Sequence, residues 1–104
     1  MAIPVKNIKG TGENARTITG SWLEYWEEET GRKADKCLAF DNDPKQDPNY
    51  VYQCESTNGL VGGHVMKVNS SDKRWYILPI CSSHNQSEDV YWAREKDLVL
   101  ATNH

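Results

Sequence analysis

The stretch WYILPICSSHN, residues 75–85, decides the fold. Its first four residues give the strongest strand signal in the chain, because aromatic and aliphatic side chains of high β-propensity follow one another. Upstream, apolar side chains alternate at Met66 and Val68, and NSSD at 69–72 has the composition of a turn. The two segments therefore predict a β-hairpin. The SSHN that follows Cys81 favours a short helix or a knuckle.

A helix is expected before the hairpin. Ser21 and Glu24 have the spacing of a capping box, and Gly31 is a typical helix end, so the helix would run to about Thr30. Residues 1–19 contain glycines and a proline without sustained periodicity. They are expected to form a flexible N-terminal arm that adds little to the core.

Length and charge limit the remaining possibilities. A chain of 104 residues is the usual size of one domain, which we place at 20–104, with LVLA at 98–101 as an additional edge strand. The net charge of −3 excludes a broadly basic surface for nucleic acid. No apolar run is long enough to span a bilayer, and no leader is recognisable. A cytoplasmic protein of α+β class without a membrane partner is therefore expected.

The cysteines suggest a metal. Cys37, Cys54 and Cys81 are odd in number, and a reducing compartment favours metal binding or simple burial over disulfides. Two residues separate Cys81 from His84, a spacing at which both side chains can reach one tetrahedral ion. With the other two cysteines this makes a Cys₃His set for a structural Zn²⁺. Three buried thiols beside a surface histidine are the alternative.

The segment DNDPKQDPN, residues 41–49, is rich in aspartate, asparagine and proline, as is typical of a loop. Its Asp41, Asn42 and Asp43 alternate as in a calcium loop, but the glycine and the distal glutamate of an EF-hand are missing. A polar surface turn is therefore expected.

The order Cys, Cys, GGHV (62–65), hairpin, YILPIC (76–81) and SSHN (82–85) resembles the treble-clef, ββα-metal core of HNH-type nucleases. The resemblance covers residues 37–85, and it implies a small zinc-stabilised, treble-clef-like domain. The chain is also similar to a group of small uncharacterised proteins that share a Ser-Trp-x-x-Tyr-Trp start and a Gly-x-His-Val middle. That second resemblance implies no activity.

The nuclease resemblance implies roles for single residues. His64 would be the general base, Asn85 would bind a catalytic Mg²⁺ or Mn²⁺, and His84 would replace the second cysteine of the zinc pair. Two positions depart from the family pattern. Gly63 stands where an acidic metal ligand is common, and Tyr76 stands where an asparagine orients the base. Structural roles for His64, including a place in the zinc site instead of Cys37, are therefore preferred.

The hairpin carries the one locally basic part of the chain. Lys67, Lys73 and Arg74 lie on or beside it, with Trp75 adjoining and Asp72 opposing them. Such a group could contact nucleic acid, although a solvated hairpin tip is the commoner explanation. We therefore expect a non-catalytic zinc module that binds nucleic acid or a protein. The alternatives are an HNH-type endonuclease and an accessory protein without an ion.

Overall fold

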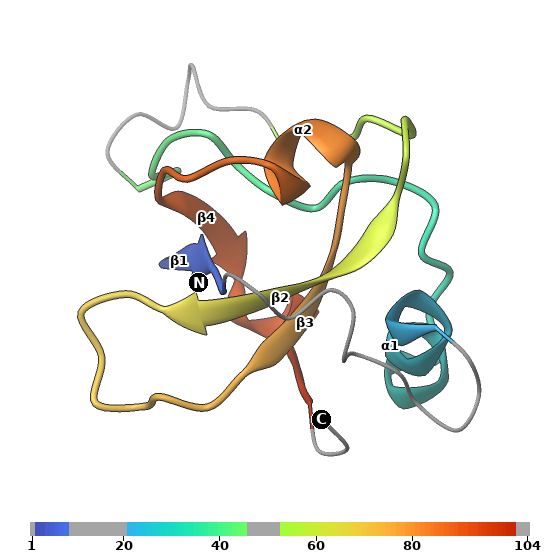
Figure 1. The fold of residues 1–104 in the computed structure, drawn as a ribbon, viewed down its shortest axis with the longest axis horizontal. Coiled ribbons are helices and arrows are strands. Elements are labelled where there is room, and N and C mark those ends of the chain that lie inside the picture. The colour runs from blue at the N-terminus through green and yellow to red at the C-terminus, as the bar shows by residue number, and fades with distance from the viewer. Residues whose placement is uncertain (1, 9–20, 46–52, 102–104) are drawn as a thin grey trace.

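The computed structural model describes residues 2–8, 21–45 and 53–101. It is a small mixed α/β fold in which a curled antiparallel sheet of order β4-β1-β2-β3-β5 is accompanied by few helices (Figure 1). The strands are β1 (Ala2–Asn7), β2 (Val61–Lys67), β3 (Tyr76–Ile80), β4 (Tyr91–Arg94) and β5 (Val99–Leu100). The helices are α1 (Trp22–Thr30), α2 (Ser82–Asn85) and the 3-10 turn η1 (Glu95–Asp97).

The predicted hairpin is confirmed as β2 and β3. The two strands pair antiparallel, with Gly63 opposite Leu78 and Val65 opposite Tyr76. Every residue of β3 is buried, because β2 and β5 flank it and the core packs against it. This complete burial explains why the sequence of β3 is a continuous apolar run, which gives the strongest strand signal in the chain.

Strand β1 differs from the flexible arm expected for residues 1–19. Ala2–Asn7 lies between β2 and β4 in the sheet, and Val5 is completely buried. The sequence conceals this strand because Pro4, which lacks a backbone N–H, is unusual in a central strand. The carbonyl of Pro4 still accepts a hydrogen bond from the backbone of Val68 at 3.0 Å. Residues 9–19 of the expected arm lie outside the described residues.

Helix α1 begins and ends where the sequence predicts. The Ser21 hydroxyl accepts a hydrogen bond from the backbone N–H of Glu24 at 3.1 Å, and Gly31 ends the helix at φ 68°. It is not the first element, however, because β1 precedes it. Trp22 and Trp26 bury its inner face against β2 and β3. At Gly62 a Cβ would lie 2.7 Å from backbone atoms of α1, so this glycine permits the close approach.

The predicted edge strand is present as β5, which pairs with β3 at the edge of the sheet. Before it, η1 places Asp97 in the core, fully buried. One carboxylate oxygen of Asp97 lies 2.7 Å from the guanidinium of Arg32, and its carbonyl accepts a hydrogen bond from the indole of Trp26 at 2.8 Å. These contacts attach α1 to the end of the sheet. Within the described ranges, none of the helices combines the length and hydrophobicity that a bilayer crossing requires.

Candidate metal centre

Three separate segments supply the cysteines and the histidine. Cys37 follows α1, and Cys81 and His84 lie at the end of β3 and in α2. Cys54 comes later in the chain than the predicted turn at 41–49, of which residues 46–49 lie outside the described residues. Backbone hydrogen bonds join the segments of Cys37 and Cys54. The N–H of Cys37 donates to Ser56, the N–H of Glu55 donates to Cys37, and the N–H of Cys54 donates to Ala39, at 2.8 to 2.9 Å. These hydrogen bonds place the segments of Cys37 and Cys54 side by side, although the two cysteines are far apart in the sequence.

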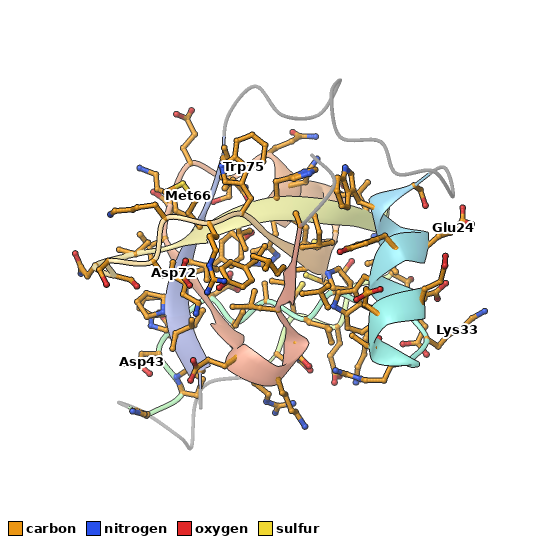
Figure 2. All side chains as sticks on the ribbon, turned by 90° about the horizontal axis from the view of Figure 1, so that it is seen from below. Glu24, Lys33, Asp43, Met66, Asp72 and Trp75 are labelled. Atoms are coloured by element: carbon orange, nitrogen blue, oxygen red, sulfur yellow. The ribbon has the colours of Figure 1, made fainter. Side chains whose placement is uncertain are left out.

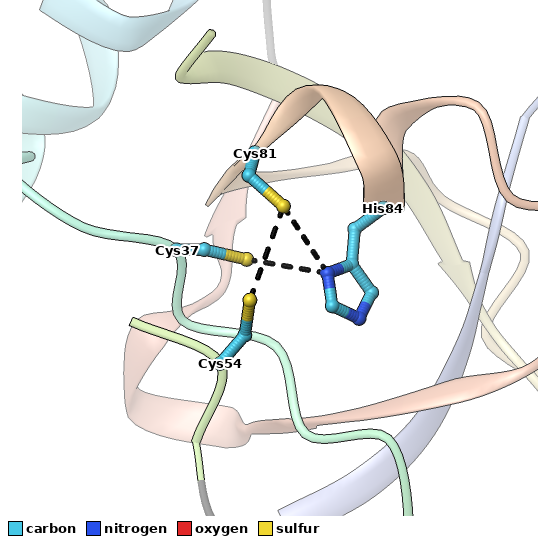
Figure 3. A group of neighbouring side chains, drawn as sticks. All are labelled: Cys37, Cys54, Cys81 and His84. Atoms are coloured by element: carbon cyan, nitrogen blue, oxygen red, sulfur yellow. Dashed lines mark hydrogen bonds between the residues drawn. The ribbon is translucent and has the colours of Figure 1, made fainter. Parts of the chain in front are cut away.

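A further hydrogen bond connects these segments to β3, because the N–H of Leu38 donates to the carbonyl of Pro79 at 3.0 Å. The side chains therefore converge from different sides (Figure 3). One ligand atom from each of Cys37, Cys54, Cys81 and His84 lies within 4.8 Å of every other. The predicted set of four is thus brought together, with Cys37 and not His64 as its fourth member.

The distances can be compared with those of a tetrahedral zinc site. With Zn–S of about 2.3 Å and Zn–N of about 2.0–2.1 Å, two sulfurs would lie about 3.8 Å apart, and sulfur and nitrogen about 3.6 Å apart. The Sγ atoms of Cys54 and Cys81 are 3.9 Å apart. Nδ1 of His84 lies 3.5 Å from Sγ of Cys37 and 3.4 Å from Sγ of Cys81. These three separations match the edges of a tetrahedral zinc site, and the remaining donor pairs lie within 4.8 Å, so the cluster is compatible with a zinc ion. All three cysteines are free, and the Cys54 and Cys81 sulfurs are too far apart for a disulfide.

The surroundings of Cys37 and Cys81 shift the pKa values of their thiols in opposite directions. Burial is the main cause that raises the pKa of the Cys37 thiol, to about 12. Burial also opposes ionisation of Cys81, but hydrogen bonds from His84, Cys37 and Cys54 outweigh it and lower the pKa of that thiol to about 6. Three thiolates in this small volume would repel one another without a cation. A divalent metal removes that penalty, because thiols that coordinate it lose their protons.

His84 uses both ring nitrogens. Nδ1 faces the sulfurs, whereas Nε2 lies 2.8 Å from Oδ1 of Asp41. Burial opposes protonation of this ring, but its contacts with Cys81 and Asp41 raise the pKa of His84 overall. Sequence reasoning missed Asp41, which belongs to the loop interpreted as a polar surface turn. The local pattern carried no signal that this carboxylate reaches a histidine 43 positions away.

His64 lies away from the cysteines. Its ring packs edge-on against Trp22 and Trp75, with centroids 5.0 and 5.9 Å away. Only 7% of the residue is exposed, which restricts the access of water and of a phosphodiester. Because side chains alternate along a strand, His64 shares the face of Gly62, which is the face that α1 covers. Its surroundings are thus those of a core histidine.

The other positions of the nuclease pattern have ordinary surroundings. Asn85 is exposed on α2. At Gly63 a Cβ would come within 2.4 Å of the Ile80 side chain, so an acidic side chain would collide with the core there. The Tyr76 hydroxyl donates a hydrogen bond to Asp72 at 2.5 Å.

Asp72, which is labelled in Figure 2, also pairs with basic residues of the hairpin. Its carboxylate lies 3.2 Å from Nζ of Lys67 and 3.0 Å from Nε of Arg74. Hydrogen bonds from Arg74 and Tyr76 hold the pKa of Asp72 well below its usual range. Lys73 is exposed, and Trp75 is partly buried. Part of the local positive charge is therefore neutralised within the hairpin.

Comparisons with protein-family models, with curated proteins and with solved structures found no match. The assignment of the site consequently depends on its geometry.

Proposed function

We propose that this chain binds one structural Zn²⁺ through Cys37, Cys54, Cys81 and His84, and that it is a non-catalytic module of treble-clef, HNH-like architecture. The observation that carries the proposal is the separation of the donor atoms, 3.4 to 3.9 Å between hydrogen-bonded pairs, which corresponds to the edges of a zinc tetrahedron.

A structural role is favoured because four protein ligands would complete the tetrahedron and leave no open position for a substrate. Three of the four residues are buried, and Cys54 is partly exposed. With 38% hydrophobic residues, the chain has few aliphatic side chains for its core. In zinc-finger peptides a structural zinc contributes about 10–16 kcal/mol, comparable to or larger than the whole stability of many small domains.

For the partner, the hairpin favours a protein over nucleic acid. Asp72 pairs with both Lys67 and Arg74, and the whole chain has a net charge of −3, so little positive charge remains for phosphates. Titration with short DNA and RNA at low and moderate salt, followed by tryptophan fluorescence, should leave the signal unchanged. A salt-dependent change that Lys73→Ala reduces would favour a nucleic-acid partner instead.

Metal quantitation tests the central proposal. The purified and dialysed chain should retain about one zinc per molecule, and Co²⁺ in its place should give the intense visible bands of a tetrahedral thiolate site. His84→Ala should reduce retention, whereas His64→Ala, the matched control, should not. A chain that holds no zinc and keeps its fold in a strong chelator would contradict the proposal and favour the accessory protein without an ion.

The nuclease alternative requires a different result. It would use His64 as base and Asn85 as a ligand of Mg²⁺ or Mn²⁺, and the burial of His64 gives it no support. Incubation of supercoiled plasmid with either ion should produce no nicking. Nicking that disappears in His64→Ala while zinc stays bound would establish the alternative.

A further inference from the structure

The ring of His84 has two nitrogens with separate neighbours. Nδ1 faces Sγ of Cys37 and of Cys81 at 3.5 and 3.4 Å, and Nε2 lies 2.8 Å from Oδ1 of Asp41. We propose that Asp41 is a positioning residue of the metal centre, which fixes the orientation and the tautomer of His84 so that Nδ1 presents its lone pair to the zinc. This inference rests on the proposed zinc binding.

The chemistry of the two groups dictates the direction of the hydrogen bond. A carboxylate can only accept, so Nε2 of His84 must carry the hydrogen in this contact. In a neutral imidazole the other nitrogen, Nδ1, is then the acceptor and the metal ligand. Without Asp41, the ring could place its hydrogen on Nδ1, where it would face the ion. A carboxylate behind a metal-bound histidine also increases the basicity of the ring.

The backbone holds Asp41 in reach of the ring. The preceding residue, Phe40, pairs with Trp92 through two backbone hydrogen bonds of 2.8 Å, one in each direction. Leu38 is attached to Pro79 of β3 in the same segment. Residues 37–41 therefore supply both a thiolate and the carboxylate behind the histidine, so one anchored segment positions two parts of the site.

Because Asp41 is mostly exposed, its role in positioning His84 can be tested separately from any contribution to packing. Its side chain is 77% exposed, whereas that of His84 is 10% exposed. Truncation of Asp41 therefore removes little buried surface and mainly removes the hydrogen bond to Nε2. Loss of such a partner typically weakens metal affinity about 10–100-fold.

The experiment measures zinc affinity of the full chain by competition with a chromophoric chelator. Asp41→Ala should weaken binding about 10–100-fold. Asp41→Asn retains an acceptor oxygen and should recover much of that loss. Asp43→Ala removes the same charge from the same loop and should stay within about twofold of wild type. In a His84→Cys background, where the ligand has no second nitrogen, Asp41→Ala should have no effect.

Nitrogen-15 NMR of the zinc-loaded chain provides a readout independent of affinity. The Nε2–H of His84 should give a signal protected from exchange, and Asp41→Ala should remove that protection. A wild-type chain that binds no zinc overturns this inference together with the proposed function. A wild-type chain that binds zinc, with Asp41→Ala unchanged or Asp43→Ala equally weakened, overturns this inference alone.

Discussion

Asn7, at the end of β1, connects the first strand to the helix that carries His84. Its Nδ2 donates hydrogen bonds to the carbonyls of His84 at 2.7 Å and of Ser87 at 3.0 Å. Its Oδ1 accepts a hydrogen bond from the hydroxyl of Tyr91 at 2.6 Å, and Tyr91 is 2% exposed. Asn7→Ala would therefore leave a hydroxyl of the core without its acceptor.

The expected cost follows from these contacts. A buried donor without a partner costs about 1–3 kcal/mol, and each lost hydrogen bond to a carbonyl costs about 0.5–1.5 kcal/mol, nearer the lower figure where water can replace Asn7. Asn7→Ala should thus lower the free energy of unfolding by about 2–4 kcal/mol. In a Tyr91→Phe background, which has no hydroxyl to satisfy, the same substitution should cost about 1–3 kcal/mol less.

The assay is urea unfolding of the zinc-loaded chain, followed by tryptophan fluorescence. Asn58→Ala serves as control because Asn58 is exposed and should change stability by less than about 0.5 kcal/mol. A flexible arm at positions 2–7 would make Asn7→Ala equally harmless. That result would refute the central position of β1.

Two further predictions concern the packing of α1 and the hairpin. Gly62→Ala would place a Cβ 2.7 Å from backbone atoms of Trp22 and Leu23, so α1 must shift, and urea unfolding should reveal a loss of about 1–3 kcal/mol; an unchanged midpoint would contradict the close approach. Asp72 has a lowered pKa in the folded state. The ionised carboxylate therefore contributes fully to the free energy of unfolding above its unfolded pKa of about 3.9, and this contribution is lost as the pH falls below that value. The stability difference between wild type and Asp72→Asn should therefore narrow below about pH 4, and a difference independent of pH would argue against the pairing with Arg74.

Much of the fold could be predicted where the signal is local. The Ser21 cap and Gly31 determine the ends of α1 within ten residues of one another, and the apolar run of β3 indicates a buried strand by itself. Strand β1 could not be predicted this way. This strand pairs with positions 61–67 and 91–94, which are distant in the sequence, and it contains Pro4, which is unusual in a central strand. Local sequence patterns therefore do not indicate it.

The residues of the site also divide into those that local spacing predicts and those that only the tertiary structure brings together. Cys81 and His84 are three positions apart, so their spacing alone predicts a shared ion. The place of Cys37 was open in the sequence, because it depends on backbone hydrogen bonds to residues 54–56 that no spacing encodes. The contact of Asp41 with the His84 ring depends on tertiary structure even more, since the pairing of Phe40 with β4 brings Asp41 to that ring.

The position of β1 between β2 and β4 has a consequence for biosynthesis. The ribosome makes this strand first among the five, but both of its neighbours are made much later, the second at positions 91–94. During translation the nascent strand therefore has unpaired edges until most of the chain has emerged. One edge of β1 cannot pair before positions 61–67 are made, and the other cannot pair before positions 91–94 are made.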